Sequence, residues 1–428
     1  MTNPLFVSRQ SLELRGDCSR VVVRSFKPSV EPREFNVLDR SRADNVIGRI
    51  LSLDADATHA MLAQVLANFD GRHRNLLRLF AERADEMLAS YAPDVELTPI
   101  HKQLLGAFFL NEYSFEAAAL FNPSIVPHPD QSGVDAGQLR VVLSLRAVGE
   151  GHVSSLTFRT AIVEADGSVI VDTANRLAAL PKVRGRVGDM LDLAFDSETE
   201  LSERIVFPVT EAQSNGLEDA RFVPFVEDGE TTYHATYTAY SGRAIRSELL
   251  TTADFQSFRL TPMKGNAASN KGMALFPRKV GGRYAMIGRQ DNENLHLLYS
   301  DDLLNWNDGT KILSPRFPWE FVQLGNCGSP IETDRGWLLL THGVGPMRHY
   351  SIGAALLDLN DPSIVIARSH EPLLQPEQSE REGYVPNVVY TCGAILHENR
   401  IVIPYAVSDS YCAFASCDLD ALLETLKP

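Results

Sequence analysis

The sequence has few cysteines, few tryptophans and no long apolar run. It has five cysteines in 428 residues, with no CxxC pair and no His/Cys cluster at zinc spacing, which argues against a disulfide framework or a structural zinc site. No window reaches the ~18 apolar residues of a membrane span, and the first twenty residues lack a signal-peptide core. We therefore expect a cytoplasmic protein whose thiols are free, small and buried.

Positive charge is also scarce. The chain carries 40 Lys and Arg against 55 Asp and Glu, for a net charge of −15, so binding to a phosphate backbone is not expected. The sequence has no GxGxxG, P-loop or GxSxG element, so nucleotide-binding and serine-hydrolase readings lack support. We expect neither nucleic acid nor membrane as a partner, and no metal or organic cofactor.

Helical periodicity is confined to the first part of the chain. Apolar residues recur at helical spacing through residues 54–91, with Gly71 predicted to separate two helices. Thr98 and Pro99 form a helix start, as N-cap and first helical residue. This pattern predicts a mainly helical N-terminal extension over residues 1–115, irregular with short strands up to about residue 50, and a second, all-β domain over 116–428.

From residue 121 one pattern repeats five times: a polar start, an apolar strand, then two further strands around a turn. The polar starts are Phe121–Ser124, Glu218–Arg221, Asn270–Met273, Gly325–Pro330 and Val385–Asn387. The second strands of three consecutive repeats lie about 50 residues apart, which is the spacing of propeller blades. We therefore expect a five-bladed β-propeller. A β-sandwich built from similar hairpins is the alternative.

Two parts of this region do not follow the repeat. Residues 165–215 are too long for a connection between blades, and we interpret them as an extension of the outer edge of the first blade. Trp319 stands in a loop that leads into the fourth polar start, where it is a candidate sugar platform, although tryptophans belong more often to the core.

In a propeller the first strands line a central channel, so the five polar starts would gather around one axial pocket. Asparagine, tyrosine and carboxylate side chains bind sugar hydroxyls, while Arg, Lys and His together bind an anion. Taken singly, His342 or Arg159 is more often structural; as a set they indicate a sugar beside a phosphate. The candidates are Asn122, Arg146, Arg159, Glu218, Asp219, Tyr237, Arg243, Asn270, Lys271, Arg289, Asn326, His342, Asn387 and Asp409.

Several of these residues lie in motifs that resemble a known family. The motifs are EDAR at 218, YTAYSGR at 237, NKGMALFPRK at 270, GNCGSPIET at 325, GWLLLTHGVG at 336, GAALLDLNDP at 353 and EREGYVPNVVY at 380, and NPS at 122 with LSLRAVGEGHVSS at 143 extends the match. As a set they resemble glycoside hydrolase family 130 over roughly residues 120 to 428. One departure is Ala220, where many members have proline.

The resemblance implies both the fold and the roles of residues. It implies a five-bladed propeller and inverting phosphorolysis of β-mannosides, with Asp219 as the acid acting through a mannose hydroxyl. Arg243, Lys271 and His342 would bind phosphate, joined by Arg159 and Arg289 as further cations of the pocket. Arg146, Asn387 and Asp409 would bind the reacting mannose. The remaining hydroxyl-binding candidates are Asn122, Glu218, Tyr237, Asn270 and Asn326.

Three features resemble the branch of the family that acts on β-1,2-linked oligomannans: the helical N-terminal extension, the motif NKGMALFPRK and the motif THGVGPMRHY. We expect an inverting phosphorylase that converts a terminal mannose and inorganic phosphate into α-mannose 1-phosphate, reversibly, with phosphate as a co-substrate. The alternatives are a β-1,2-mannosidase, with Glu218 or Glu150 as the base that activates water, and a non-catalytic sugar-binding propeller. A homo-oligomer is left open by the sequence.

Overall fold

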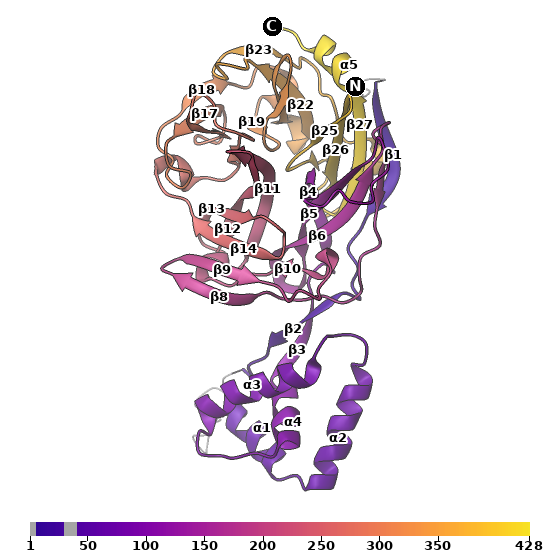
Figure 1. The fold of residues 1–428 in the computed structure, drawn as a ribbon, viewed down its shortest axis with the longest axis vertical. Coiled ribbons are helices and arrows are strands. Elements are labelled where there is room, and N and C mark those ends of the chain that lie inside the picture. Colours follow the sequence, from indigo (N-terminus) through magenta and orange to yellow (C-terminus); the bar gives the residue numbers. More distant parts are fainter. Residues whose placement is uncertain (1–5, 30–40) are drawn as a thin grey trace. The chain divides into compact units, whose positions relative to one another are not determined.

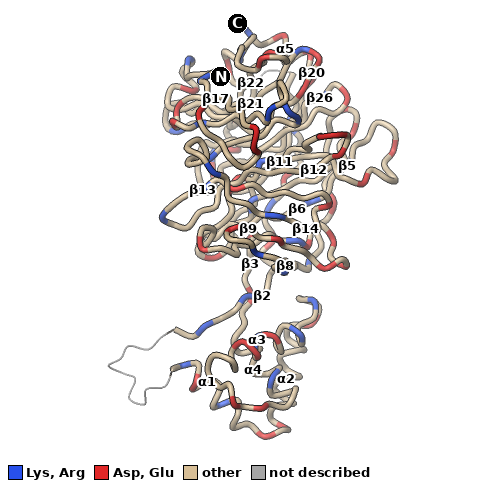
Figure 2. Tube along the Cα trace, turned by 60° about the vertical axis from the view of Figure 1, so that its left-hand side comes forward, with Lys and Arg blue, Asp and Glu red and all other residues tan. Residues whose placement is uncertain are grey.

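The computed structural model describes residues 6–29 and 41–428. Of these, residues up to Cys18, Phe115–Asn175 and Leu180–Pro428 form one compact unit, and Ser19–Ser114 with Arg176–Ala179 form a second. No helix in the described ranges has the length and apolar character needed to cross a membrane. Figure 2 shows acidic and basic residues interspersed along both units.

The second unit is helical, with one antiparallel pair of short strands from its two ends. Its elements are α1 (Arg42–Leu51), α2 (Ala55–Asn68), α3 (Leu76–Tyr91), α4 (Pro99–Ala107), β2 (Val21–Ser25) and β3 (Leu110–Ser114). Ser41 and Asp44 close a capping box on α1, and Thr98 caps α4 with Pro99 in its first turn, as predicted. Gly71, with φ of +67°, lies between α2 and α3, also as predicted.

The first unit is a five-bladed β-propeller (Figure 1). Blade 1 contains β4 (Ala119–Pro127), β5 (Leu139–Val148) and β6 (Ser154–Val163), with β7 (Val169–Val171) and β10 (Ile205–Val206) paired to β6. Blade 2 contains β11 (Gly216–Glu227), β12 (Glu230–Tyr240), β13 (Ile245–Thr252) and β14 (Ser257–Pro262). Blade 3 contains β15 (Ala274–Leu275), β16 (Tyr284–Gly288), β17 (Leu295–Ser300) and β18 (Thr310–Leu313).

Blades 4 and 5 complete the ring. Blade 4 contains β19 (Gln323–Asn326), β20 (Ile331–Thr333), β21 (Gly336–Val344), β22 (Tyr350–Leu357) and β23 (Val365–Arg368). Blade 5 contains β24 (Val389–Tyr390), β25 (Ile395–His397), β26 (Arg400–Val407) and β27 (Tyr411–Asp418), followed by α5 (Leu419–Thr425). Strand β26 lies against β4, so blade 5 meets blade 1.

Apolar clusters fill the spaces between neighbouring blades. Val141 and Leu143 of blade 1 pack with Val402 and Phe414 of blade 5 in one such cluster. Similar clusters join blades 2 and 3, 3 and 4, and 4 and 5. Packing between successive sheets around a ring, and not between two stacked sheets, is what distinguishes this fold from the sandwich alternative.

Two blade edges are formed by segments that the sequence pattern did not assign to them. Strand β1 (Val7–Leu14) is the outer strand of blade 5, where it pairs antiparallel with β27 and joins Val7 to Cys417. The hairpin of β8 (Lys182–Val187) and β9 (Met190–Ala194) extends blade 2 through β14, whereas only β7 and β10 of that segment extend blade 1. These pairings join strand edges that lie far apart in the sequence, so no local sequence pattern indicates them. The expected boundary between an N-terminal extension, residues 1–115, and a second domain, residues 116–428, stays a prediction.

Candidate active site

The ends of the second strands lie on one face of the ring. In each blade the beginning of the first strand pairs with the end of the second, as in Gly216 with Tyr240 and Val389 with Val407; the other three blades do the same. The turn after every second strand therefore stands beside the start of a channel-lining strand. These five turns, near residues 149–153, 241–244, 289–294, 345–349 and 408–410, surround one mouth.

A cavity of about 340 Å³ opens at this mouth, within the range of small-molecule sites. Seven of the predicted site residues line it: Asn122, Arg146, Asp219, Lys271, Arg289, His342 and Asp409. The structure adds Asn292, Gln323, Arg348, Tyr350, Val385, Val388 and Tyr390. All five blades contribute, which is what the five polar starts predicted.

Asp219 projects from a bulge in β11. The register with β12 shifts between Glu218 and Arg221, and Asp219 has a left-handed backbone with φ of +54°. A bulge of the same kind in β4 presents Asn122, with φ of +49°. Bulges re-aim side chains and are frequent next to active sites. The two bulges bring Asn122 Nδ2 to 2.5 Å from Asp219 Oδ1.

Arg146 holds both acidic residues of the EDAR motif. Its Nη2 donates to Glu218 Oε1 at 2.7 Å, and its Nη1 donates to Asp219 Oδ1 at 3.3 Å. Lys271 Nζ lies 3.9 Å from Glu218 Oε2. Burial raises the pKa of Asp219, but the charges of Arg146 and Lys271 outweigh it and leave that pKa below its usual range. Asp219 is therefore ionised in the free protein at neutral pH.

Asp409 is the second carboxylate of the cavity. It stands in the turn after β26, with φ of +50°. Burial, followed by the charge of Asp219, raises the pKa of Asp409 to about 6, against the opposing effect of Arg146. Two carboxyl groups in one cavity thus have pKa values shifted in opposite directions, as in sites that move protons.

We expect Asp409→Asn to stabilise the protein at neutral pH. Because the folded-state pKa of Asp409 is raised, the unfolded chain releases its proton first, so stability falls as pH rises from about 4 to about 6. The neutral variant does not lose this stability. The loss of unfolding free energy that it avoids is at most about 3 kcal/mol for a shift of about two pKa units. Thermal unfolding from pH 4 to 7.5 checks it.

The matched control is Asp228→Asn, since Asp228 also has a left-handed backbone, with φ of +52°, but lies on an exposed turn. It measures how the replacement of an aspartate in a left-handed turn outside the cavity changes the unfolding temperature. A stability gain of Asp409→Asn that is the same at pH 4 and pH 7.5 would contradict the electrostatic account.

Basic residues make up another part of the cavity lining, the basic wall. Lys271 and Arg289 of blade 3 and Arg348 of blade 4 line it, together with His342. Burial, then the charges of Arg289 and Arg221, hold the pKa of His342 well below its usual value. His342 is therefore neutral, and the expectation of a cationic His342 is corrected: it can serve an anion as a hydrogen-bond donor only.

Arg221 lies under the cavity and joins four blades. From β11 it donates to the carbonyls of Gly272 at 3.1 Å and Asn326 at 2.9 Å, and to the hydroxyl of Tyr390. Its buried charge is thus solvated by oxygens of blades 3, 4 and 5. The arginine of EDAR positions the strands around the cavity and does not line it.

Three amide side chains at or beside the cavity have buried atoms without a partner among the described residues. They are Asn122 Oδ1, Gln323 Nε2 and both side-chain atoms of Asn326. A buried polar atom without a hydrogen bond costs about 1–3 kcal/mol, and native proteins seldom leave it so. These atoms indicate a place for a polar ligand or its water.

Some candidates lie away from the cavity lining. Tyr237 is buried and bonds Glu248 and Gln213, and Arg159 is buried in an ion pair with Glu116 at 2.9 Å. Both side chains are engaged outside the cavity, so we withdraw Tyr237 as a sugar ligand and Arg159 as a phosphate ligand. Trp319 is buried, donates to the carbonyl of His370 and is no sugar platform.

Four further candidates stand beside the cavity. Asn270 fixes the turn of blade 3 by donating to the carbonyl of Arg289 and to Asn292. Asn387 accepts from Arg381 Nε at 2.7 Å. Glu218 meets the cavity through Arg146. Arg243 is exposed in the turn after β12.

Arg348 and Tyr350 are the main cavity residues that sequence reasoning missed. Both lie in or after the turn that follows β21, inside the motif THGVGPMRHY. Their signal was available: the corresponding turns of other blades supplied Arg243, Arg289 and Asp409. Of the five cysteines, four are buried as expected, whereas Cys18 is exposed.

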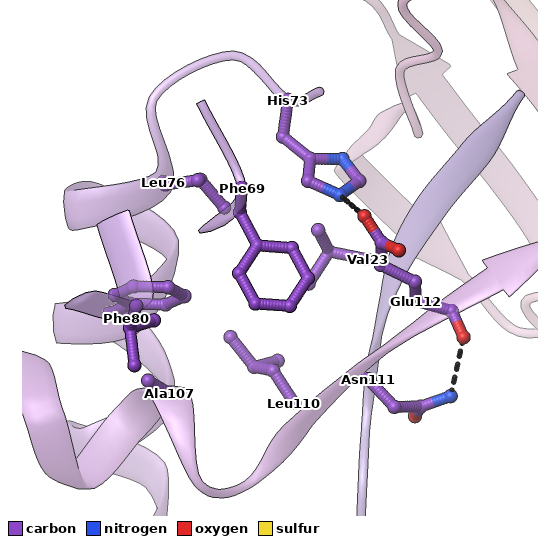
Figure 3. A pocket seen from close by; sticks show the side chains of 10 residues that line it. Val23, Phe69, His73, Leu76, Phe80, Ala107, Leu110, Asn111 and Glu112 are labelled. Carbon is purple, nitrogen blue, oxygen red and sulfur yellow. Dashed lines mark hydrogen bonds and ion pairs between the residues drawn. The ribbon is translucent and has the colours of Figure 1, made fainter. Parts of the chain in front are cut away.

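A smaller hollow lies within the helical unit. Figure 3 shows Phe69, Phe80 and Leu110 around it, with His73 Nε2 and Glu112 Oε1 2.7 Å apart at its rim. Arg72 also pairs with Glu112, at 2.7 Å. At about 60 Å³ the hollow is too small for a sugar ring.

Comparison with known proteins agrees with this geometry. The model of one family, described as beta-1,4-mannooligosaccharide phosphorylase, matches residues 191–428, more than half of the chain. The chain belongs to glycoside hydrolase family 130. The expected family is thereby confirmed, and with it that the protein is an enzyme.

The relatives within family 130 are mannoside phosphorylases. A 1,2-beta-oligomannan phosphorylase of Thermoanaerobacter is 37% identical over 51% of this chain and 74% of its own. A beta-1,2-mannobiose phosphorylase of Listeria innocua is 35% identical over 50% of this chain and 60% of its own. The Listeria enzyme's structure in complex with beta-1,2-mannobiose aligns with a TM-score of 0.52 at 24% identity, over 72% of this chain and 92% of that chain, which shows the shared fold.

Proposed function

We propose that this family 130 protein is an inverting β-1,2-oligomannan phosphorylase. A phosphate oxygen attacks the anomeric carbon of the terminal mannose, the glycosidic C–O bond breaks, and the leaving oxygen takes a proton that originates from Asp219. The products are α-mannose 1-phosphate and an oligomannan shorter by one residue. The observation that carries the proposal is one cavity lined both by the carboxylates Asp219 and Asp409 and by the cations Lys271, Arg289 and Arg348.

The basic wall suits phosphate as the nucleophile. A hydrolase that inverts needs a second carboxylate to activate water, whereas phosphate is already nucleophilic and needs cations to hold it beside an acidic site. Lys271 and Arg289 supply charge, and neutral His342 supplies a donor. We keep Arg243 as a phosphate ligand that approaches from its exposed turn.

Phosphate also prepares the acid. Asp219 is ionised in the free protein because Arg146 and Lys271 lower its pKa. A bound phosphate neutralises part of the field of Lys271, and a bound sugar excludes water, so both raise that pKa. Asp219 thus gains its proton in the ternary complex, where an acid is needed. The family resemblance implies that the proton passes through a mannose hydroxyl.

The proposal of a β-1,2 linkage rests on the relatives. The two relatives above, at 37% and 35% identity, are named for β-1,2-linked mannosides. A beta-1,4-mannooligosaccharide phosphorylase of Ruminococcus albus is 31% identical over 37% of this chain and 51% of its own. The higher identities and longer matches favour the β-1,2 linkage over the linkage in the family description.

Hydrolysis is the second candidate, and Asp409 is the observation that favours it. A carboxyl with a pKa of about 6 could accept a proton from water while Asp219 serves as the acid. One structural neighbour is described as showing that this family of mannoside phosphorylases contains glycoside hydrolases acting on beta-1,2 mannosidic linkages in Candida mannan. It aligns with a TM-score of 0.53 at 21% identity, over 72% of this chain and 87% of that chain.

One assay separates the two reactions and also tests the non-catalytic alternative. The protein is incubated with β-1,2-mannobiose, -triose or -tetraose, with and without inorganic phosphate and without added metal. We expect mannose 1-phosphate only when phosphate is present. Free mannose released at the same rate without phosphate would support hydrolysis, and oligomannan binding without any turnover would support a sugar-binding propeller. Parallel reactions on β-1,4-mannobiose test the linkage.

A further inference from the structure

Two exposed rings meet on the rim of the mouth and belong to neighbouring blades. Tyr384, in the loop before β24 of blade 5, stacks on His152, in the turn after β5 of blade 1. Their ring centroids are 5.5 Å apart with 29° between the planes, and the Tyr384 hydroxyl lies 3.3 Å from His152 Nδ1. Tyr384 is nevertheless 63% exposed. The mechanism described so far uses neither ring.

The loop that carries Tyr384 is fixed to the turn that carries Asp409. The backbone N–H of Tyr384 donates to Ser410 Oγ at 2.9 Å, and that of Val385 donates to the carbonyl of Ser408 at 2.9 Å. A Cβ at Gly383 would stand 2.6 Å from Ser408 Cβ, so the close approach needs glycine. Val385 itself lines the cavity. Tyr384 is thus held one residue from the cavity wall.

The position of this pair in the ring is opposite blade 3. In a ring of five blades the boundary between blades 5 and 1 faces blade 3, which contributes Lys271 and Arg289. In an inverting displacement the nucleophile and the leaving group lie on opposite faces of the sugar ring. With phosphate at the blade 3 side, the leaving oligomannan extends toward blades 5 and 1, where Tyr384 stands.

We propose that Tyr384, stacked on His152, is the platform that binds the acceptor part of the oligomannan, outside the reacting mannose. This inference rests on the proposed function. A β-mannose ring carries axial C–H bonds on one face, and an aromatic face with its negative quadrupole attracts such polarised hydrogens. The stack with His152 orients the tyrosine, while the exposed surface of the ring remains available to the sugar.

The test uses the full-length protein in the synthetic direction, with mannose 1-phosphate as donor and β-1,2-mannobiose as acceptor. We expect Tyr384→Ala to raise the KM for the acceptor about tenfold, of the size of one aromatic contact, with the KM for mannose 1-phosphate unchanged. Tyr384→Phe keeps the ring and should stay within about threefold of the wild type. Tyr91→Ala is the matched control, because Tyr91 is an exposed tyrosine at the end of α3. An unchanged acceptor KM in Tyr384→Ala, or an equal rise in both KM values, would overturn the proposal.

Binding without turnover separates this inference from the proposed function. Calorimetric titration of β-1,2-mannotriose, without phosphate, should show about tenfold weaker binding to Tyr384→Ala than to the wild type and Tyr91→Ala. If binding weakens in this way but the wild type forms no mannose 1-phosphate, the platform stands and phosphorolysis is wrong. If the wild type is a phosphorylase and the variant binds equally well, the platform is wrong. A wild type that binds no oligomannan contradicts both.

Discussion

Asp219→Asn should abolish turnover, with a loss at the upper end of the 10²–10⁴-fold range of general acid catalysis. Asparagine is nearly isosteric and tolerates the left-handed backbone at this position, with φ of +54°, but it cannot release a proton to the leaving sugar. That sugar is an unactivated alcohol, so its departure depends strongly on protonation. Initial rates of mannose 1-phosphate formation measure the effect.

The fold of this variant should survive with a modest loss of stability at neutral pH. Because the folded-state pKa of Asp219 is lowered, its ionised form stabilises the protein above the unfolded pKa, and this contribution disappears as pH falls through the folded value. Asp219→Asn and Asp409→Asn should therefore shift the unfolding temperature in opposite directions at pH 7. Asp228→Asn again serves as control. A variant of Asp219 that keeps more than about a tenth of the wild-type rate would show that the acid lies elsewhere.

Lys271→Ala should raise the KM for phosphate by about ten- to a hundredfold and change the oligomannan KM little. A charge-assisted hydrogen bond to an anion contributes roughly 1.5–3 kcal/mol, and Lys271 lines the basic wall. In the synthetic direction the same variant should weaken mannose 1-phosphate binding instead. A matrix of initial rates over both substrates provides all four constants.

Two companion variants test the other proposed phosphate ligands, and a third variant serves as the control. His342→Ala should cost less than Lys271→Ala, because a neutral imidazole offers a hydrogen bond without charge. Arg243→Ala should raise the phosphate KM strongly if its exposed side chain closes on the anion. Lys279→Ala is the control, since Lys279 pairs with Glu227 outside the cavity lining. An unchanged phosphate KM in Lys271→Ala with a raised oligomannan KM would assign Lys271 to the sugar and favour hydrolysis.

The sequence predicted the blades better than their edges. The second and third strands of each blade follow the repeat read from the sequence, because each is a continuous apolar run bounded by turns; the run after the second polar start continues into β12, Glu230–Tyr240. The pairing of β1 with β27, and of β9 with β14, depends on which open edges meet in space. Such contacts leave no periodic signal along the chain.

The site was predicted from residue type, and its errors follow from geometry. Arg159 lies on β6, the third strand of blade 1, two strand spacings of about 4.8 Å from the channel-lining strand, so its side chain meets Glu116 instead. Tyr237 points to Glu248 on the neighbouring strand. Charge alone suggested a protonated His342, whereas complete burial between Tyr350 and Tyr390 makes it neutral. The direction in which a strand side chain points, and how deeply it is buried, depend on the folded ring and not on residue type alone.

The strand β1 also sets the order in which this ring can be completed. On the ribosome, Val7–Leu14 is synthesised before any blade, yet its partner β27 is made after all the other strands of the propeller. Until β27 has been made, the edge of β1 has unpaired backbone N–H and C=O groups. Such an edge can pair with other molecules. Contacts of this separation slow folding, because the entropy of closing the loop is lost before the contact forms. The pairing of β1 with β27 can therefore form only after β27 has been synthesised, and a chaperone that shields an unpaired strand edge would act at this join.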